Sequence, residues 1–209
     1  MKNSPSPSVA WHYTTVIGMA GINETGFVSL ATHDIGPSEN PVAWFSTNPT
    51  LERTLREMAY QRADGSYVRA QTVAEHRVTG HGLYRIASET AQLHRWVDLV
   101  KVAGISHTRR RNLEKMAHKA GAVPYEWYGR MTPLPLTEAL GVDYYDGVAW
   151  KPLALDEISQ RLVIEQQAAA PLLERMLRGS RADAEPMNSQ TLDREMDLVA
   201  KDRRAAARP

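Results

Sequence analysis

The sequence predicts an α+β protein with a mixed, mostly antiparallel sheet, a helical insertion and a helical C-terminal tail. Three observations carry this prediction. Short segments rich in aromatic and β-branched residues recur before residue 90, and such segments are typical of strands. Over about 90–128 the apolar residues instead recur every three or four positions, which indicates amphipathic helices. Two alternating strands then flank Asp146-Gly147 in "VDYYDGVAWKPL", which predicts a type I′ hairpin.

Length and composition set the domain organisation. The chain has 209 residues, a net charge of +1 and no cysteine, which excludes disulfides, thiolate zinc sites and a cysteine nucleophile. We expect a disordered lead over 1–9, an α+β domain over 10–155 with the insertion at about 90–128, and a partly disordered helical tail over 156–209. No signal peptide and no apolar run of membrane-spanning length is found, so we expect a cytoplasmic protein without membrane contact.

The first strand is expected in "WHYTT", residues 11–15. Alternation along a strand places Trp11 and Tyr13 on one side and His12 and Thr14 on the other. A histidine between two aromatic residues is unusual in a buried strand. The side that carries it is therefore either a cleft or a part of the core.

The elements that follow are read from the same periodicities. "VIGMAGINETG" predicts a helix that ends at Gly26. "FVSLATH" and "PVAWFST" predict two strands, and the second is an almost unbroken apolar run, so it should be central. "TNPTLERTLREMA" predicts a helix capped by Thr47 or Asn48, with Pro49 in its first turn. The residues expected on the inner face of the first helix are Ile17, Ala20, Gly21 and Glu24.

The middle of the chain continues with short elements and then the insertion. "YQRADGSYVRAQ" predicts two extended pieces around the Asp64-Gly65 turn, "TVAEHRVTG" one or two helical turns, and "GLYRIAS" a strand. The insertion should contain two helices, "ETAQLHRWVDLVKVAG" and "SHTRRRNLEKMAHKAGA". Gly121 should end the second helix, and "VPYEWYG" is predicted to be an aromatic loop or a short helix.

Several common catalytic motifs are missing from the sequence. It has no Gly-rich loop ending in Lys-Ser/Thr, no G-x-G-x-x-G and no G-x-S-x-G. None of its seven histidines forms the i, i+4 pair with a glutamate that marks a helical zinc protease. We therefore expect neither a nucleotide-binding Gly-rich loop, nor a serine-hydrolase elbow, nor a metal site.

The insertion carries a basic cluster formed by Arg109, Arg110 and Arg111, with Lys115 one turn further on. Spacings of three and four residues put Arg111, Lys115, His118 and Lys119 roughly along one helical face. Such a stripe can neutralise the phosphates of a nucleic acid. The alternative is a solvated face opposite the apolar residues of the same helix.

The sharpest chemical candidate is His12 together with the end of the "PVAWFST" strand. His12 can donate or accept hydrogen bonds at neutral pH, and Ser46 offers a hydroxyl. Tyr13 or Trp44 could stack on a flat ring. Glu89, at the end of "YRIASE", could polarise a ribose hydroxyl or steady an oxocarbenium-like centre. The alternative is a core histidine bonded to backbone, with the hydroxyl residues capping the next helix.

The pattern of a "HYTT" strand, a helix ending in glycine, a short strand and "VAWFSTNP" resembles the N-terminal half of ADP-ribosyltransferase-like proteins. The resemblance implies an NAD-handling cleft that uses a first-strand His, matched by His12, and a second-strand aromatic or Ser. It also implies a later catalytic glutamate, for which we choose Glu89, with Glu126 as second choice. Neither lies in an E-x-E pattern, and Tyr or Ser-Thr-Ser is more usual on the second strand. The cofactor-binding residues would be Tyr13, Thr14, Trp44 and Ser46.

The expected function follows from this resemblance. The protein would use NAD as a substrate and either transfer ADP-ribose to a macromolecule or hydrolyse NAD, without a metal. The wider spread of motifs over 10–153 also resembles uncharacterised bacterial and phage proteins, from which no activity carries over. The rival hypothesis is a non-enzymatic phage or mobile-element protein that binds a protein or nucleic acid through its insertion or tail. The sequence leaves the target and the oligomeric state open.

Overall fold

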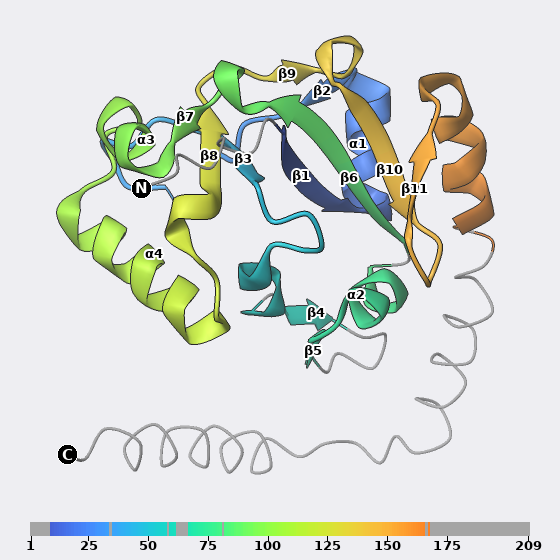
Figure 1. The fold of residues 1–209 in the computed structure, drawn as a ribbon, viewed down its shortest axis with the longest axis horizontal. Coiled ribbons are helices and arrows are strands. Elements are labelled where there is room, and N and C mark those ends of the chain that lie inside the picture. Colours follow the sequence, from blue (N-terminus) through green and yellow to red (C-terminus); the bar gives the residue numbers. More distant parts are fainter. Residues whose placement is uncertain are drawn as a thin grey trace, which may run out of the picture.

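The computed structural model describes residues 9–33, 35–57, 59–61, 67–80, 82–165 and 167. Within these ranges seven strands form one sheet in the order β11-β10-β6-β1-β3-β8-β7 (Figure 1). The predicted α+β class is confirmed. Every pairing in this sheet is antiparallel, so the described strands contain none of the parallel pairs that a mixed sheet implies. Of the predicted lead over 1–9, residues 1–8 lie outside the described residues, as does the tail beyond 167, and Val9 already belongs to the first strand.

The elements have the following bounds. The strands of the large sheet are β1 (Val9–Thr15), β3 (Ala43–Ser46), β6 (Leu83–Glu89), β7 (His94–Arg95), β8 (Trp127–Arg130), β10 (Gly141–Tyr145) and β11 (Trp150–Leu153). Two small ladders pair β2 (Phe27–Val28) with β9 (Leu134–Pro135) and β4 (Ala59–Gln61) with β5 (Tyr67–Arg69). The helices are α1 (Val16–Thr25), α2 (Val73–Thr79), α3 (Trp96–Val102) and α4 (His107–Ala120). Residues 158–165 are also helical, and 3₁₀ turns occupy Arg53–Glu57, Thr90–Gln92, Pro124–Glu126, Leu136–Glu138 and Leu155–Glu157.

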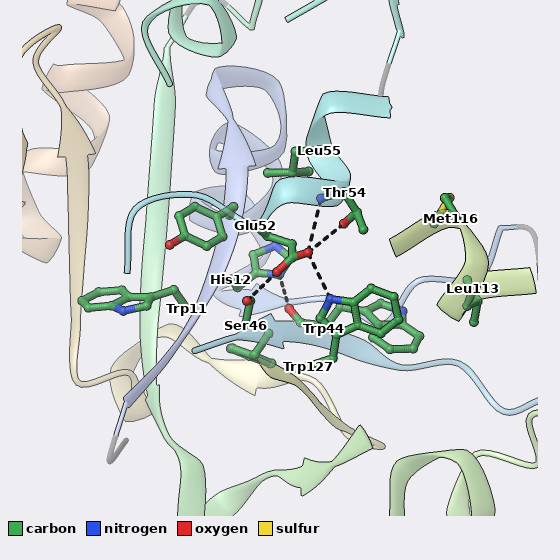
Figure 2. Close-up of a pocket in the computed structure, with 12 residues that line it drawn as sticks. Trp11, His12, Trp44, Ser46, Glu52, Thr54, Leu55, Leu113, Met116 and Trp127 are labelled. Atoms are coloured by element: carbon green, nitrogen blue, oxygen red, sulfur yellow. Dashed lines mark hydrogen bonds between the residues drawn. The ribbon is translucent and has the colours of Figure 1, made fainter. Parts of the chain in front are cut away.

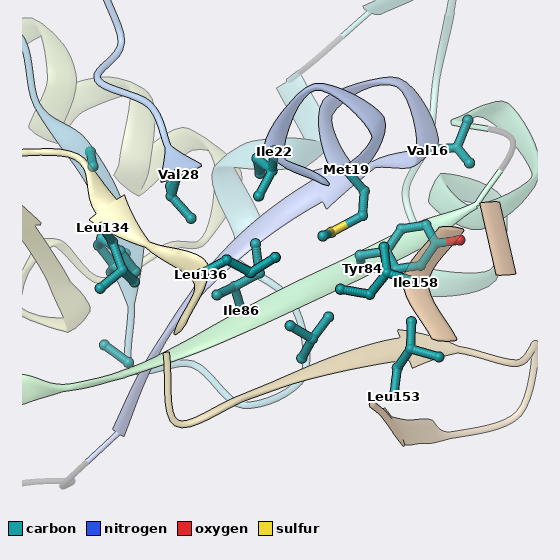
Figure 3. Packing of buried hydrophobic residues seen from close by; sticks show 14 of the residues in the cluster. Val16, Met19, Ile22, Val28, Tyr84, Ile86, Leu134, Leu136, Leu153 and Ile158 are labelled. Carbon is teal, nitrogen blue, oxygen red and sulfur yellow. The ribbon is translucent and has the colours of Figure 1, made fainter. Parts of the chain in front are cut away.

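Helix α1 covers one face of the sheet and builds the main core with it. Val16, Met19 and Ile22 are buried on the helix, and Figure 3 shows them above Tyr84 and Ile86 of β6. The helix ends at Gly26 as predicted, with φ of 76°. The predicted inner face was wrong, except that Ala20 packs against this core in a partly buried position. The exposed residues of α1 include Ile17, Gly21 and Glu24.

The helical insertion packs on the other end of the sheet. Leu99 of α3 and Trp127 of β8 are buried in a second apolar cluster, and a Cβ at Gly129 would come within 2.7 Å of the Leu99 side chain. Helix α4 has the predicted ends: the Ser106 hydroxyl accepts the amide of Arg109, and Gly121 follows with φ of 71°. The first predicted insertion helix is shorter, because 94–95 pair with β8 as β7.

The helix predicted over 47–59 does not form, except for the 3₁₀ turn at 53–57. Residues 47–52, which we call the strap, cross the sheet instead. The carbonyls of Asn48 and Thr50 accept hydrogen bonds from Tyr13 and Trp150 of the sheet. In a helix these carbonyls would accept hydrogen bonds from the backbone amides four residues later. The sheet side chains take the place of those amides, so the first helical turn does not form.

The β10–β11 hairpin is present, but its turn differs from the predicted type. The last register pair is Tyr145 with Trp150, so the loop has four residues, whereas a type I′ turn connects strands with two. The Asp146 carboxylate accepts the amides of Val148 and Ala149, both at 2.8 Å, and these bonds hold the longer loop. In "VPYEWYG" a 3₁₀ turn leads into β8, a strand that the sequence pattern did not indicate.

Candidate functional site

A cavity of about 260 Å³ opens on the face of the sheet opposite α1. Its floor is formed by β1 and β3, with β8 beside them. Leu55 of the 3₁₀ turn after the strap lines one side, and Leu113 and Met116 of α4 line the other (Figure 2). Arg53 links these two sides, because its guanidinium donates to the carbonyl of Gly121, the residue that follows α4. Two segments that are far apart in the sequence therefore enclose the cavity.

His12 lies where β1 and β3 separate. The two strands share one register pair, Trp11 with Ser46. Beyond this pair the backbone pairing between β1 and β3 stops, and the His12 side chain bridges the two strands instead. Its Nδ1–H donates to the carbonyl of Trp44 at 2.9 Å. Burial lowers the pKa of His12, and the bond to Trp44 opposes this only in part. A neutral ring with its proton on Nδ1 leaves Nε2 as a hydrogen-bond acceptor.

Glu52, at the end of the strap, is the charged residue that lines the cavity. Oε2 accepts the Ser46 hydroxyl at 2.5 Å. Oε1 accepts the Trp127 indole N–H at 3.0 Å and both the amide and the hydroxyl of Thr54 at 3.3 and 3.2 Å; these bonds are drawn in Figure 2. Because Oε1 has three donors and Oε2 one, Oε2 keeps a free accepting direction. Among the described residues, no lysine or arginine forms an ion pair with this carboxylate.

Aromatic rings make up most of the remaining lining. Trp11, Tyr13, Trp44 and Trp127 all contribute to the cavity. Burial raises the pKa of Tyr13 well above its usual 10, so its hydroxyl stays a donor, and it bonds to the carbonyl of Asn48. The negative faces of aromatic rings attract cations, as does the Glu52 carboxylate. The cavity therefore suits a flat, positively charged ring, and its volume lies below the roughly 300–1,000 Å³ that encloses larger ligands.

The structure brings together most of the predicted site residues, but not all. His12, Tyr13, Trp44 and Ser46 line the same cavity. Thr14 does not; a Cβ added at Gly18 of α1 would collide with its hydroxyl, so Thr14 supports the close packing of α1.

Glu89 is not in the cavity. It is exposed at the end of β6, opposite Val9, and it lines a separate hollow with Thr90 and Leu140. Val9 lies three residues before His12, which corresponds to roughly 10 Å along a strand. The carboxylate beside His12 is that of Glu52. The local sequence pattern did not indicate it, because that pattern placed Glu52 within a helix; Asn48-Pro49, a dipeptide that marks turns, was the available signal.

Only part of the basic cluster on α4 is free of ion pairs with described residues. Arg109 lies 3.8 Å from Glu39 and Arg110 2.8 Å from Glu114, and the bond from Arg110 is the main cause of the lowered pKa of Glu114. Arg111 and Lys115 are exposed. Together with His118 they line an open hollow on the outer side of the helix, as the spacing predicted. Helix α4 thus borders the cavity with one side and presents a basic stripe on the next.

Metal ligands do not cluster in the described part of the chain: no group of three or more His, Asp or Glu side chains there could hold an ion. Within the same ranges, no helix has the length and apolar character needed to span a bilayer. Comparison of the chain with protein-family models, curated proteins and solved structures gives no significant match. The site must therefore be interpreted from its own geometry.

Proposed function

We propose that this protein is an NAD-binding enzyme with an ADP-ribosyltransferase-like fold, which transfers ADP-ribose to a macromolecule or hydrolyses NAD. One observation carries the proposal: the Glu52 carboxylate sits in an aromatic cavity beside a strand-borne His12, without a cation from the described chain. Support also comes from the resemblance, because its first-strand His and its second-strand Trp44 and Ser46 lie around this same cavity.

The nicotinamide ring of NAD has the properties that the cavity selects. It is flat and carries a positive charge, so it can stack on Tyr13 or Trp44 and be attracted by Glu52. The cavity takes this ring, and the adenosine part of NAD would lie outside it. A reduced nicotinamide has no charge, so it gains nothing from the carboxylate.

The reaction breaks the bond between C1′ of the ribose and the nicotinamide nitrogen. The electron pair leaves with nicotinamide, and positive charge develops on the ribose. The free accepting direction of Glu52 Oε2 would bond a ribose hydroxyl and stabilise that charge, which is the role that the sequence pattern suggested for Glu89. His12 Nε2 lines the same cavity, so it would accept a hydrogen bond from the ribose next to nicotinamide and not from the ribose on the ADP side. Water or a nucleophile of the target then bonds to C1′ and releases its proton to solvent.

Calorimetry with oxidised and reduced NAD tests this proposal. The wild-type protein should bind NAD⁺ more tightly than NADH by about tenfold, which corresponds to about 1.4 kcal/mol. Glu52→Gln keeps the shape of the side chain and removes its charge, so the preference for NAD⁺ should disappear. A folded wild-type protein that binds neither form, or that binds both equally, would overturn the proposal.

A second candidate function, nucleic-acid binding, is favoured by the outer side of α4. Arg111 and Lys115 form no ion pair with described residues and lie on one exposed side. Fluorescence anisotropy with a labelled single-stranded oligonucleotide, repeated over a range of salt concentrations, tests it. The double variant Arg111→Glu, Lys115→Glu should weaken binding and reduce the salt slope by about 0.7 for each phosphate that is no longer neutralised. Lys101→Glu, on α3, is the matched control, and binding that ignores salt would contradict the idea.

A further inference from the structure

The strap is fixed to the sheet by an unusual run of contacts. Three consecutive carbonyls, those of Asn48, Pro49 and Thr50, each accept a hydrogen bond from a sheet side chain. The donors come from three different strands: Tyr13 from β1, Arg85 from β6 and Trp150 from β11. The strap then reaches Glu52 only two residues later. Its attachment to the sheet therefore decides where the Glu52 carboxylate lies.

Arg85 is the centre of this attachment. Its guanidinium carbon lies 3.8 Å from the centre of the Trp11 ring and 4.5 Å from that of Trp150. Nε and Nη2 bond to the Asp143 carboxylate at 2.8 and 2.7 Å, while Nη1 donates to Pro49. The side chain is 12% exposed. Nε and Nη2 both bond to the same oxygen, Oδ2. A planar guanidinium is needed for this combination, because an ammonium group lacks the flat face that stacks on two rings while separate N–H groups bond to Asp143 and Pro49.

Arg85 does not line the cavity, so it cannot touch a ligand there. We infer that Arg85, held by Asp143 and stacked between Trp11 and Trp150, is a positioning residue that keeps the strap on the sheet and thereby holds Glu52 in the cavity. For the reaction itself this inference rests on the proposed function. The positional part of it concerns only the protein and is testable without NAD.

The indole N–H groups provide a direct readout. Trp127 donates to Glu52 and Trp150 donates to Thr50 of the strap, whereas Trp96 donates to Glu114, away from the strap. In a ¹⁵N-labelled protein each indole gives its own cross-peak, and single Trp→Phe variants assign them. The Trp127 cross-peak therefore reports the position of Glu52. Because the Trp96 ring packs edge-on against Trp127, with ring centres 5.2 Å apart, its cross-peak is no independent reference, and a matched variant serves as the reference instead.

The test compares Arg85→Lys with Arg161→Lys. Arg161 also stacks on an aromatic ring, that of Tyr144, at 4.0 Å, and pairs with a carboxylate, that of Glu165, but it makes no contact with the strap. Arg85→Lys should move the Trp127 and Trp150 cross-peaks, whereas Arg161→Lys should leave Trp127 unchanged. A Trp127 cross-peak that stays in place in a folded Arg85→Lys variant would overturn the inference.

A second variant and a binding measurement complete the experiment. If Arg85→Lys does not fold, Trp150→Phe removes the donor to Thr50 and replaces the indole that stacks on Arg85 with a smaller ring. It should move Trp127 in the same direction by less; no movement would again overturn the inference. If NAD binds the wild type, Arg85→Lys should raise its Kd several-fold and Arg161→Lys should not. If the wild-type protein does not bind NAD, only the proposed function is overturned, because the cross-peaks test the role of Arg85 without NAD.

Discussion

The two faces of the large sheet differ in what they bury. The face under α1 is apolar, with Tyr84, Ile86 and Val142 at 2% exposure or less. The opposite face carries Arg85 with Asp143 and, at the cavity, Glu52, while His12, which pairs with Ile86, reaches the cavity from the gap between β1 and β3. Charged groups are costly to remove from water unless they are bonded, and each of these groups has bonded partners. The first face supplies stability, while the second holds polar groups in fixed positions, as a ligand site requires.

The largest expected effect is a loss of stability, and it should differ between substitutions on the two faces. Leu134→Ala, on the α1 side where Leu134 has 0% exposure, should lower the free energy of unfolding by about 2–5 kcal/mol. Leu113→Ala, which trims the cavity wall on α4, should cost only about 1 kcal/mol, because Leu113 is only partly buried. Urea unfolding of both variants measures the difference. Equal losses would mean that the cavity face contributes to the core as much as the α1 face does.

A smaller effect concerns His12, which is half-buried. The pKa of His12 in the folded protein lies below the usual 6.5 because of burial. Below about pH 6.5 the unfolded chain therefore binds a proton at His12 that the folded protein does not bind. Stability is therefore full above about pH 6.5 and falls as the pH drops, by at most about 1.4 kcal/mol per pH unit for one group. His76, whose pKa is also lowered by burial, adds to the same decline.

His12→Asn separates the two histidines, because the Asn amide can still donate to the carbonyl of Trp44 but does not titrate. Denaturation midpoints between pH 5 and 7.5 should fall less in this variant than in the wild type. His118→Asn, which removes an exposed histidine of α4, should follow the wild-type curve. A His12→Asn curve parallel to the wild type would show that His12 does not couple to folding.

Much of the fold could be predicted from local patterns. The first strand, α1 with its glycine end, α4 with both of its ends, β6 and the β10–β11 pair all follow from periodicity, caps and turn residues. The failures share a physical cause, which is tertiary contact. The 47–59 segment has good helical signals, but Tyr13, Arg85 and Trp150 bond to its carbonyls. Those donors come from strands that no local pattern connects to the segment.

The candidate site, like the fold, was predictable only where it depends on local sequence patterns. Alternation along β1 and the "WFS" run identified His12, Tyr13, Trp44 and Ser46, which lie on paired strands and therefore meet. The carboxylate was not predictable, because Glu52 enters the cavity from the strap. Glu89 was chosen from its place at a strand end, and the register puts that end away from His12.

Release of nicotinamide from NAD, followed by chromatography, tests the central claim most directly. The wild type, Glu52→Gln and Glu89→Gln are compared, with NAD alone and with a cell lysate added as a source of acceptors. We expect equal release by the wild type and Glu89→Gln, and release at least about 100-fold slower by Glu52→Gln, the usual cost of losing one group that stabilises transition-state charge. No release by the wild type, or release that depends on Glu89 and not on Glu52, would contradict the proposed role of the cavity.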